Sequence, residues 1–499
     1  MEALDWLVIG VFFLALIGII VWVVRQKQND SADYFLGGRD ATWLAIGASI
    51  FASNIGSEHL IGLAGAGASS GMAMAHWEIQ GWMILILGWV FVPFYTRSMV
   101  YTMPEFLERR YNPQSRTILS VISLVSYVLT KVAVTVYAGG LVFQQVFGIK
   151  ELWGIDFFWI AAIGLVVLTA LYTIFGGMKS VLYTSVLQTP ILLLGSLIIL
   201  VLGFKELGGW DEMMRVCGAV TVNDYGDTMT NLIRSNDDAN FPWLGALIGS
   251  AIIGFWYWCT DQFIVQRVLS GKNEMEARRG TIFGAYLKLL PVFLFLIPGM
   301  IAFALHQKYI GAGGEGFLPM LENGTANADA AFPTLVAKLL PAGVKGLVVC
   351  GILAALMSSL ASLFNSSAML FTIDFYKRFR PQTSEKKLVG IGQVATVVIV
   401  ILGILWIPIM RSVGDVLYTY LQDVQSVLAP GIAAAFLLGI CWKRTSAQGG
   451  MWGLISGMVI GLTRLGAKVY YSNAGEVADS TFKYLFYDCL LYTSPSPRD

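Results

Sequence analysis

The sequence predicts an all-α integral membrane protein, from its composition and from the spacing of its apolar segments. Of its 499 residues, 56% are hydrophobic and 13% are charged, whereas a typical soluble domain has about 25% charged residues. Twelve apolar segments, each about the length needed to cross a bilayer, follow one another along the chain. Two of these segments are interrupted by glycines and small polar residues, which a plain membrane-spanning helix avoids.

The apolar segments can be assigned as individual spans. The first begins close to Met1, after the acidic Glu2 and Asp5 and without a small-residue cleavage site, so we interpret it as a spanning helix rather than a signal peptide. Residues 489–499 contain two prolines and a charged end, cannot complete a span, and are interpreted as a non-native tail. We expect spans at residues 4–25, 43–70, 76–96, 117–146, 153–175, 183–203, 242–266, 281–305, 343–375, 388–410, 415–441 and 450–470, and the start of another near Phe482.

Positive charges gather in alternate loops between these spans. Lys and Arg cluster within residues 25–39, 97–116, 267–279 and 377–387, and loops of this kind face the cytoplasm in membrane proteins. The loop at 204–241 is rich in Asp and Glu instead. The pattern predicts a multi-pass protein of the cell membrane whose N-terminus is extracellular or periplasmic.

Composition excludes several classes of function. The net charge of +1 leaves no basic face for a nucleic-acid partner. The five cysteines are scattered, without CxxC or Cys/His spacing, so neither a metal centre nor a disulfide framework is indicated. An enzyme would need a nucleophile–base pair or a metal pair, and with three histidines and no HExxH motif we expect none. A channel would need a continuous polar lining or a repeated filter, and neither is visible.

The first interrupted segment carries the strongest functional signal. Within the span at 43–70, the run Ala52-Ser53-Asn54-Ile55-Gly56-Ser57-Glu58-His59 places polar and ionisable groups at mid-depth. Such groups usually face a bundle interior or a water-filled cavity, and a helix broken there frees carbonyls that can hold a cation. A second interrupted segment, 248–258, lies five spans later. Paired broken helices at corresponding places indicate an inverted-repeat transporter.

Several motifs of the chain resemble motifs of the sodium/solute symporter family, in particular of its sodium/glucose cotransporter branch, and they occur in the same order along the chain. The resemblance runs from about residue 6 to about 487. Its motifs are residues 33–39 (DYFLGGR), 52–57 (ASNIGS), 256–262 (WYWCTDQ), 264–267 (IVQR), 286–289 (YLKL), 357–366 (MSSLASLFNS) and 442–444 (WKR).

The resemblance implies a LeuT-like core of two five-helix inverted repeats, with one additional helix before it and one or two after it. We expect an extra N-terminal transmembrane helix in 1–30, the first repeat in 43–203, an extracellular loop in 204–241, the second repeat in 242–441, C-terminal helices in 450–487 and the foreign tail in 489–499.

Sodium is the coupling ion that the resemblance implies, and we expect no organic cofactor. The implied ligands are carbonyl and hydroxyl oxygens of Ala52, Ile55, Ala355, Ser358 and Ser359. The residues themselves agree with this, because a hard cation prefers oxygen ligands and a serine pair on an apolar helix supplies two hydroxyls. Some relatives have an acidic residue where this chain has Ser185, and the loss of that carboxylate favours one sodium per substrate over two.

A sugar is the substrate that the resemblance implies, bound by groups that donate and accept hydrogen bonds. The implied binding residues are Asn54, His59, Glu78, Tyr257, Trp258, Lys288 and Gln422. The implied gate residues are Leu63, Trp77 and Tyr418 on the outer side and Tyr257 on the inner side. Glu78 and Lys288 are charged residues inside spans, which favours a functional role, although they could also form a purely structural ion pair.

One departure leaves the substrate open. Gly254 stands where relatives often have an Asn or Thr that touches the sugar, so the pocket loses a hydrogen-bonding group there and gains room. A glucose- or galactose-like monosaccharide is the first expectation, and myo-inositol, another small polar solute, or a non-transporting sugar sensor of the same fold are the alternatives. We expect the bilayer, Na⁺ and a small sugar or polyol as partners, and no obligate protein partner.

Overall fold

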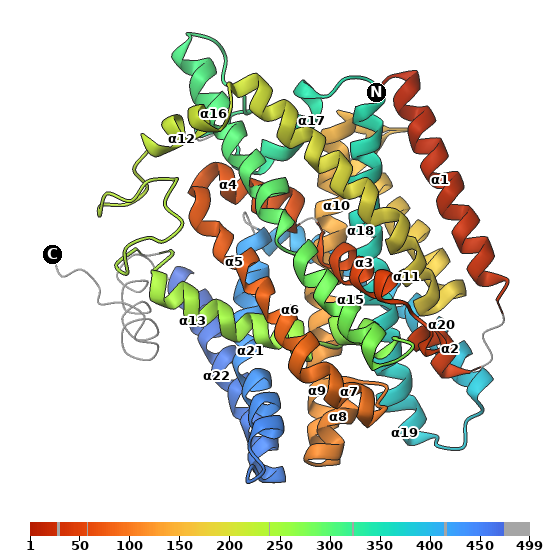
Figure 1. Ribbon diagram of the computed structural model, residues 1–499. Helices are drawn as coiled ribbons and strands as arrows, with labels where there is room; N and C mark the ends of the chain where they lie inside the picture. The colour runs from red at the N-terminus through yellow and green to blue at the C-terminus, as the bar shows by residue number, and fades with distance from the viewer. Residues whose placement is uncertain (27–29, 57, 239, 322–323, 414–416, 474–499) are drawn as a thin grey trace.

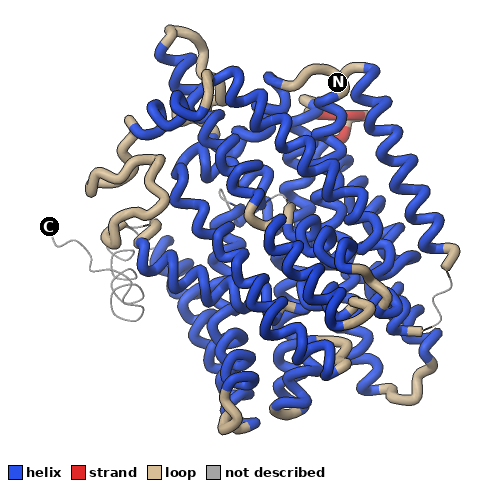
Figure 2. The backbone as a smooth tube through the Cα atoms, in the orientation of Figure 1, coloured by secondary structure: helices blue, strands red, loops and turns tan. Residues whose placement is uncertain are grey.

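The protein is almost entirely helical. The computed structural model describes residues 1–26, 30–56, 58–238, 240–321, 324–413 and 417–473. Figure 2 shows the helices packed side by side, with one short antiparallel pair of strands, β1 (Glu151–Leu152) and β2 (Ile155–Asp156), at an edge. Within the described residues, eight helical segments are long and apolar enough to cross a membrane.

The helices follow the predicted spans closely. In the first half of the chain they are α1 (Ala3–Val24), α2 (Ser31–Leu36), η1 (Gly37–Arg39), α3 (Trp43–Asn54), η2 (Glu58–Leu63), α4 (Ala64–Ser70), η3 (Gly71–Ala75), α5 (His76–Ile79), η4 (Gln80–Trp82), α6 (Met83–Ile86), η5 (Leu87–Phe91), α7 (Val92–Ser98), α8 (Met103–Arg110), α9 (Pro113–Ser126), η6 (Tyr127–Val132), α10 (Ala133–Phe147), α11 (Phe157–Leu207) and α12 (Trp210–Gly218). In the second half they are α13 (Trp243–Gly254), η7 (Phe255–Thr260), α14 (Gln262–Leu269), α15 (Glu274–Leu287), η8 (Val292–Leu296), α16 (Ile297–Gly311), η9 (Ala328–Ala330), α17 (Ala331–Leu339), α18 (Val344–Met369), η10 (Leu370–Tyr376), α19 (Lys377–Phe379), α20 (Glu385–Val413), α21 (Leu417–Cys441) and α22 (Ala447–Asn473). The predicted start of a span near Phe482 and the predicted tail at 489–499 lie outside the described residues.

Two predicted spans are joined in α11, which contains residues 157–175 of the span predicted at 153–175 and the whole of 183–203. The helix is kinked at Gly177, which has a φ of 53°. A Cβ at this position would lie 2.4 Å from the carbonyl oxygen of Tyr34, so only glycine allows both the turn and the close approach of α2. The division of the chain into two repeats remains a prediction.

Helix α18 lies at the centre of the bundle. It packs along α11 and beside α3, and α15 packs along α3. Every residue from Ala354 to Met369 is buried. In Figure 1 the N-terminus lies on the same side of the bundle as α12 and α17, and α8 and α19 lie on the opposite side.

Both ends of α18 are fixed by polar contacts. At its start, Asp5 of α1 accepts hydrogen bonds from the backbone N–H groups of Gly343 (2.7 Å) and Gly346 (2.8 Å), which no helical carbonyl can satisfy. Just beyond its end, Asp374 pairs with Arg116 at 2.7 Å and accepts a hydrogen bond from Thr102.

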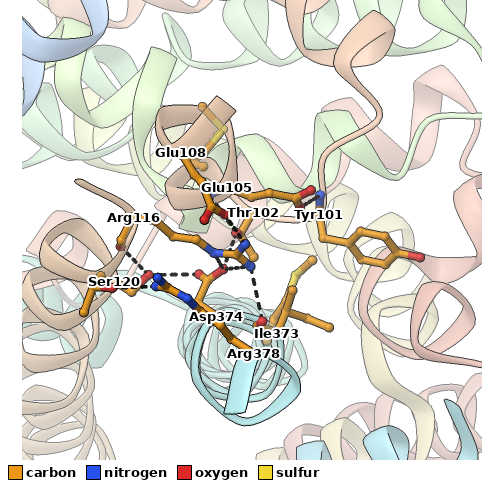
Figure 3. Close-up of polar contacts among 12 residues, drawn as sticks. Tyr101, Thr102, Glu105, Glu108, Arg116, Ser120, Ile373, Asp374 and Arg378 are labelled. Atoms are coloured by element: carbon orange, nitrogen blue, oxygen red, sulfur yellow. Dashed lines mark hydrogen bonds and ion pairs between the residues drawn. The ribbon is translucent and has the colours of Figure 1, made fainter. Parts of the chain in front are cut away.

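The contacts of Asp374 form part of a larger network at this end of the bundle. Figure 3 shows Arg116 between Asp374 and Glu108, with Ser120 also bonded to Asp374. The carboxylate therefore joins η10 to α9 and to the segment that leads into α8, and it is satisfied although it is buried.

Substitution of Asp5 tests the first of these anchors. Asp5→Ala leaves the two N–H groups at the start of α18 without their acceptor, so we expect a stability loss of about 1–3 kcal/mol and a lower melting temperature of the purified protein. Glu315→Ala, at an exposed loop carboxylate, is the control and should melt as the wild type does. Equal melting of the two variants would show that Asp5 does not anchor α18.

Candidate functional site

The first break lies where the sequence predicts it. Helix α3 ends at Asn54, and Ile55 is extended, with φ −83° and ψ 105°. The chain resumes as a π-helical turn, η2, at Glu58. Because the helix ends here, its last carbonyl groups have no helical N–H partners and are free to bind other groups.

Serines of α18 face this break. Ser359 Oγ donates to the carbonyl oxygen of Ser53 at 2.7 Å and lies 3.3 Å from that of Ile55. Hydroxyl and carbonyl oxygens are the ligands that a hard cation prefers, so this cluster fits a sodium ion chemically. The five predicted sodium ligands, Ala52, Ile55, Ala355, Ser358 and Ser359, are all buried. The Ser53 carbonyl was not predicted, because which carbonyl faces α18 depends on how α3 packs against α18.

A second layer of hydroxyl groups lies behind Ser358. Ser185 of α11 is 3.2 Å from Ser358 and 3.4 Å from Ser49, measured between hydroxyl oxygens. Ser49 also accepts a hydrogen bond of 3.0 Å from Nε of the buried Arg267. No carboxylate of the described residues pairs with any of these serines, so the layer is neutral apart from the guanidinium group.

The second break differs from the prediction. The segment expected to be interrupted, 248–258, is helical throughout, and the chain leaves helical geometry at Asp261, which has φ −73° and ψ 129°. Helix α13 continues as the π-helical η7, which contains four aromatic residues, Phe255, Trp256, Tyr257 and Trp258, and α14 starts directly after Asp261. Hydropathy alone could not separate a π-helical turn from a break.

Charged residues at the second break form a site that the sequence analysis missed. Lys131 of η6 pairs with Asp261 at 2.6 Å, and Tyr127 donates its hydroxyl to the same carboxylate. The Lys131 ammonium lies 4.7–5.4 Å from the ring centres of Tyr127, Trp256, Tyr257 and Phe263. The signal was available, because an ionisable residue within a span is a candidate functional residue.

Three of the predicted substrate-binding residues form one buried polar cluster. Lys288 Nζ lies 2.7 Å from Glu78 and 2.8 Å from His59 Nε2, and His59 lies 3.2 Å from Glu78. Lys288 also lies 5.6 Å from the ring centre of Trp258. The side chain of each charged partner is at most 5% exposed, so their opposite charges compensate each other in a region of low dielectric.

A small cavity of about 60 Å³ connects this cluster with the first break. At its edge Asn54 donates a hydrogen bond of 2.9 Å to the hydroxyl of Tyr257. The lining residues are Asn54, Glu58, His59, Trp77, Glu78, Gln80, Ile253, Tyr257, Trp258, Lys288 and Gln425.

The cavity contains most of the predicted site and some additional residues. Glu58, Gln80, Ile253 and Gln425 line it and were not predicted, because their proximity depends on how η2, η4, α13 and α21 pack together. Leu63, a predicted outer gate, is buried but is not among the lining residues. The side chains of Tyr418 and Gln422, also predicted, lie outside the described part of the structure.

A comparison with known proteins identifies the family to which the chain belongs. Residues 34–457 match the Sodium:solute symporter family. The chain belongs to this family. It is therefore a sodium-coupled solute symporter and a multi-pass membrane protein, not an enzyme.

Two relatives illustrate the similarity in sequence. The chain is 37% identical to sodium/myo-inositol cotransporter 2 of Homo sapiens over 514 residues, which cover 99% of this chain and 75% of the relative. It is also 37% identical to sodium/glucose cotransporter 4 of Mus musculus, over 99% of this chain and 76% of the relative. These similarities confirm the predicted family and branch.

A solved structure confirms the predicted fold. A Na⁺-coupled sialic acid symporter, in a substrate-bound outward-open state, superposes with a TM-score of 0.75, covers 93% of this chain and 98% of its own, and is 21% identical. The symporter described here therefore has the LeuT-like transporter fold.

The Glu78–Lys288 pair can be tested by a double-mutant cycle. Glu78→Gln or Lys288→Met alone leaves one buried charge uncompensated, which costs about 3–5 kcal/mol. We expect each single variant to melt at a lower temperature than the double variant in detergent without substrate. The exposed pair of Glu212 and Arg215, also 2.7 Å apart, is the matched control, and its variants should melt as the wild type does. Additive effects of Glu78→Gln and Lys288→Met would contradict a mutually compensating pair.

Proposed function

We propose that this symporter couples the inward movement of one sodium ion to the import of a small polyhydroxylated ring. The observation that carries the proposal is the geometry of the first break. Carbonyl groups of Ser53 and Ile55 meet Ser359, while the side chain of Asn54, between them in sequence, contacts Tyr257 at the cavity. One interruption of the backbone therefore serves both an ion and a solute.

The proposed sodium ligands are the oxygens of Ala52, Ile55, Ala355, Ser358 and Ser359. Ala355 lies four residues before Ser359 on α18, so the two share a face of the helix. The Ser53 carbonyl is an additional candidate because it is the oxygen nearest to Ser359. One sodium rather than two is supported by the neutral Ser185, which offers a hydroxyl where a second cation would need a carboxylate.

The proposed substrate contacts are chosen by their chemistry. Glu78 accepts hydrogen bonds, Lys288 donates them, and Asn54 and a neutral His59 do both. Ring hydroxyl groups also donate and accept, so a glucose- or galactose-like monosaccharide is the first candidate. Tyr257 and Trp258 supply an aromatic face, and Gln422 remains a proposed contact.

A specific observation favours myo-inositol as the second candidate. Gly254 lies beside the cavity residue Gln80 and adds no hydrogen-bonding group of its own. Residue 254 therefore makes no side-chain hydrogen bond to a ring hydroxyl and does not itself discriminate between glucose and myo-inositol. Sodium/myo-inositol cotransporters are among the most similar relatives.

The charge of the cavity argues against an anionic substrate. Its described lining residues include two carboxylates, Glu58 and Glu78, and one ammonium group, Lys288. A carboxylate ligand would add a third negative charge to a region of low dielectric, which is unfavourable. A neutral solute does not meet this penalty.

Alternating access would move the solute past gates on either side of the cavity. We propose Leu63, Trp77 and Tyr418 as the outer gate and Tyr257 as the inner one.

We also place the protein in the plasma membrane with its N-terminus outside, since the basic loops then face the cytoplasm. One charge moved through 100 mV is worth about 2.3 kcal/mol, and a tenfold sodium gradient adds about 1.4. Together they support roughly 500-fold accumulation.

Uptake into proteoliposomes tests the proposal. With an inward sodium gradient we expect accumulation of labelled D-glucose or myo-inositol, and none of a short carboxylate or of sialic acid. Replacement of sodium by choline should abolish uptake. Uptake that is unchanged in choline would refute the coupling, and binding without any uptake would favour the sensor alternative.

Ser359→Ala tests the sodium site. The variant loses one oxygen that would bind the cation and keeps the cavity groups. A polar contact to a charged group contributes enough free energy that its loss should raise the half-saturating sodium concentration, measured at saturating solute, about tenfold or more. Ser367→Ala is the matched control, because Ser367 is buried on the same helix and its hydroxyl has no partner among the described residues. An equal sodium dependence in the two variants would remove Ser359 from the site.

A further inference from the structure

Gln80 and Gly254 meet at the wall of the cavity. Gln80 begins η4 and Gly254 ends α13. A Cβ placed on Gly254 would lie 2.9 Å from Gln80 Oε1 and 3.3 Å from Gln80 Cβ. The Gln80 side chain therefore lies along the bare backbone of Gly254, in space that any larger residue at 254 would enter.

The amide oxygen of Gln80 has an unused capacity for hydrogen bonding. It is buried and has no hydrogen-bond partner among the described residues. Buried polar atoms are paired in the great majority of cases, and one without a partner calls for an explanation. Since Gln80 lines the cavity, a hydroxyl group of a bound solute is a chemically suitable donor.

The surroundings of Gln80 favour a solute that donates several hydrogen bonds. The amide oxygen of Asn54, on the same cavity, is also without a partner among the described residues. Two amide acceptors and the Glu78 carboxylate converge on the cavity with the apolar Ile253 beside them. This pattern suits a ring that has hydroxyl groups at its edge and C–H groups on its face.

We propose that Gln80 determines solute specificity by accepting a hydrogen bond from one ring hydroxyl, and that the absence of a side chain at Gly254 leaves the space that its amide needs for this contact. The inference rests on the proposed function, whose solute is a polyhydroxylated ring. Residue 254 on α13 offers no side chain for a polar contact, and Gln80 on η4 supplies the acceptor instead. The position of Gln80 therefore determines which ring hydroxyl is recognised.

The geometry allows two independent variants to disturb the same contact. Gln80→Ala removes the acceptor. Gly254→Ala brings a methyl group within 2.9 Å of the amide oxygen, closer than a Cβ tolerates. Because the displaced atom is the far end of a flexible side chain, the amide can move while the helices stay in place. Gly249→Ala on the same helix is the matched control, since nothing lies within 4 Å of a Cβ there.

The experiment measures uptake of labelled D-glucose and myo-inositol into proteoliposomes at saturating sodium. Gln80→Ala and Gly254→Ala should each raise the half-saturating solute concentration about 5- to 150-fold, the equivalent of a buried hydroxyl donor that has lost its acceptor. The double variant should be no weaker than Gln80→Ala alone, and Gly249→Ala should behave as the wild type does. The half-saturating sodium concentration, measured at saturating solute, should not change.

A series of monodeoxy sugars and deoxyinositols separates recognition from a structural effect. If Gln80 accepts from one hydroxyl, a single deoxy analogue should bind wild type and Gln80→Ala equally, while the other analogues keep the difference. An equal loss for every analogue, additive losses in the double variant, or an unchanged half-saturating concentration in Gln80→Ala would each overturn the inference. A wild type that accumulates neither probe would overturn the proposed function and, with it, this inference.

Discussion

A helix that ends in the middle of a membrane must satisfy its last carbonyl groups with partners other than its own backbone. In this symporter Ser359 of α18 supplies that partner at the end of α3. The contact depends on the position of α18, which Asp5 fixes at one end and Asp374 fixes near the other. The contacts of Asp5 and Asp374 near the two ends of α18 therefore determine where the Ser359 hydroxyl lies at the centre of the bundle.

Tyr257 connects the two helix breaks. Its hydroxyl accepts a hydrogen bond from Asn54, directly beside the first break. The face of its ring lies 4.7 Å from the ammonium group of Lys131, which pairs with Asp261 at the second. A solute that displaces the Asn54–Tyr257 contact would act on both breaks at once, since a rotation of this ring also changes the surroundings of Lys131. The proposed inner gate is thus held by two groups from the first half of the chain, Asn54 and Lys131.

Sequence reasoning reached the first break because glycine and ionisable residues inside an apolar segment conflict with a plain spanning helix. It also named Glu78 and Lys288, which are charged residues inside spans and lie 2.7 Å apart. It misplaced the second break, because the chain winds as a π-helix through Thr260 and pattern alone does not distinguish this from an interruption. Gln80 and Glu58 were missed because their positions at the cavity depend on crossings between helices distant in sequence.

In the mechanism we propose, the break at the end of α3 links ion binding to solute binding, and thermodynamic linkage measures this coupling directly. Two binding sites that share a structural element must affect each other reciprocally. Equilibrium binding to the purified protein should show that sodium raises the affinity for labelled myo-inositol or D-glucose, and that the solute raises the affinity for sodium by the same factor. A coupling of about 1–3 kcal/mol corresponds to a factor of about 5 to 150. Solute affinity that is identical with sodium and with choline would contradict the claim.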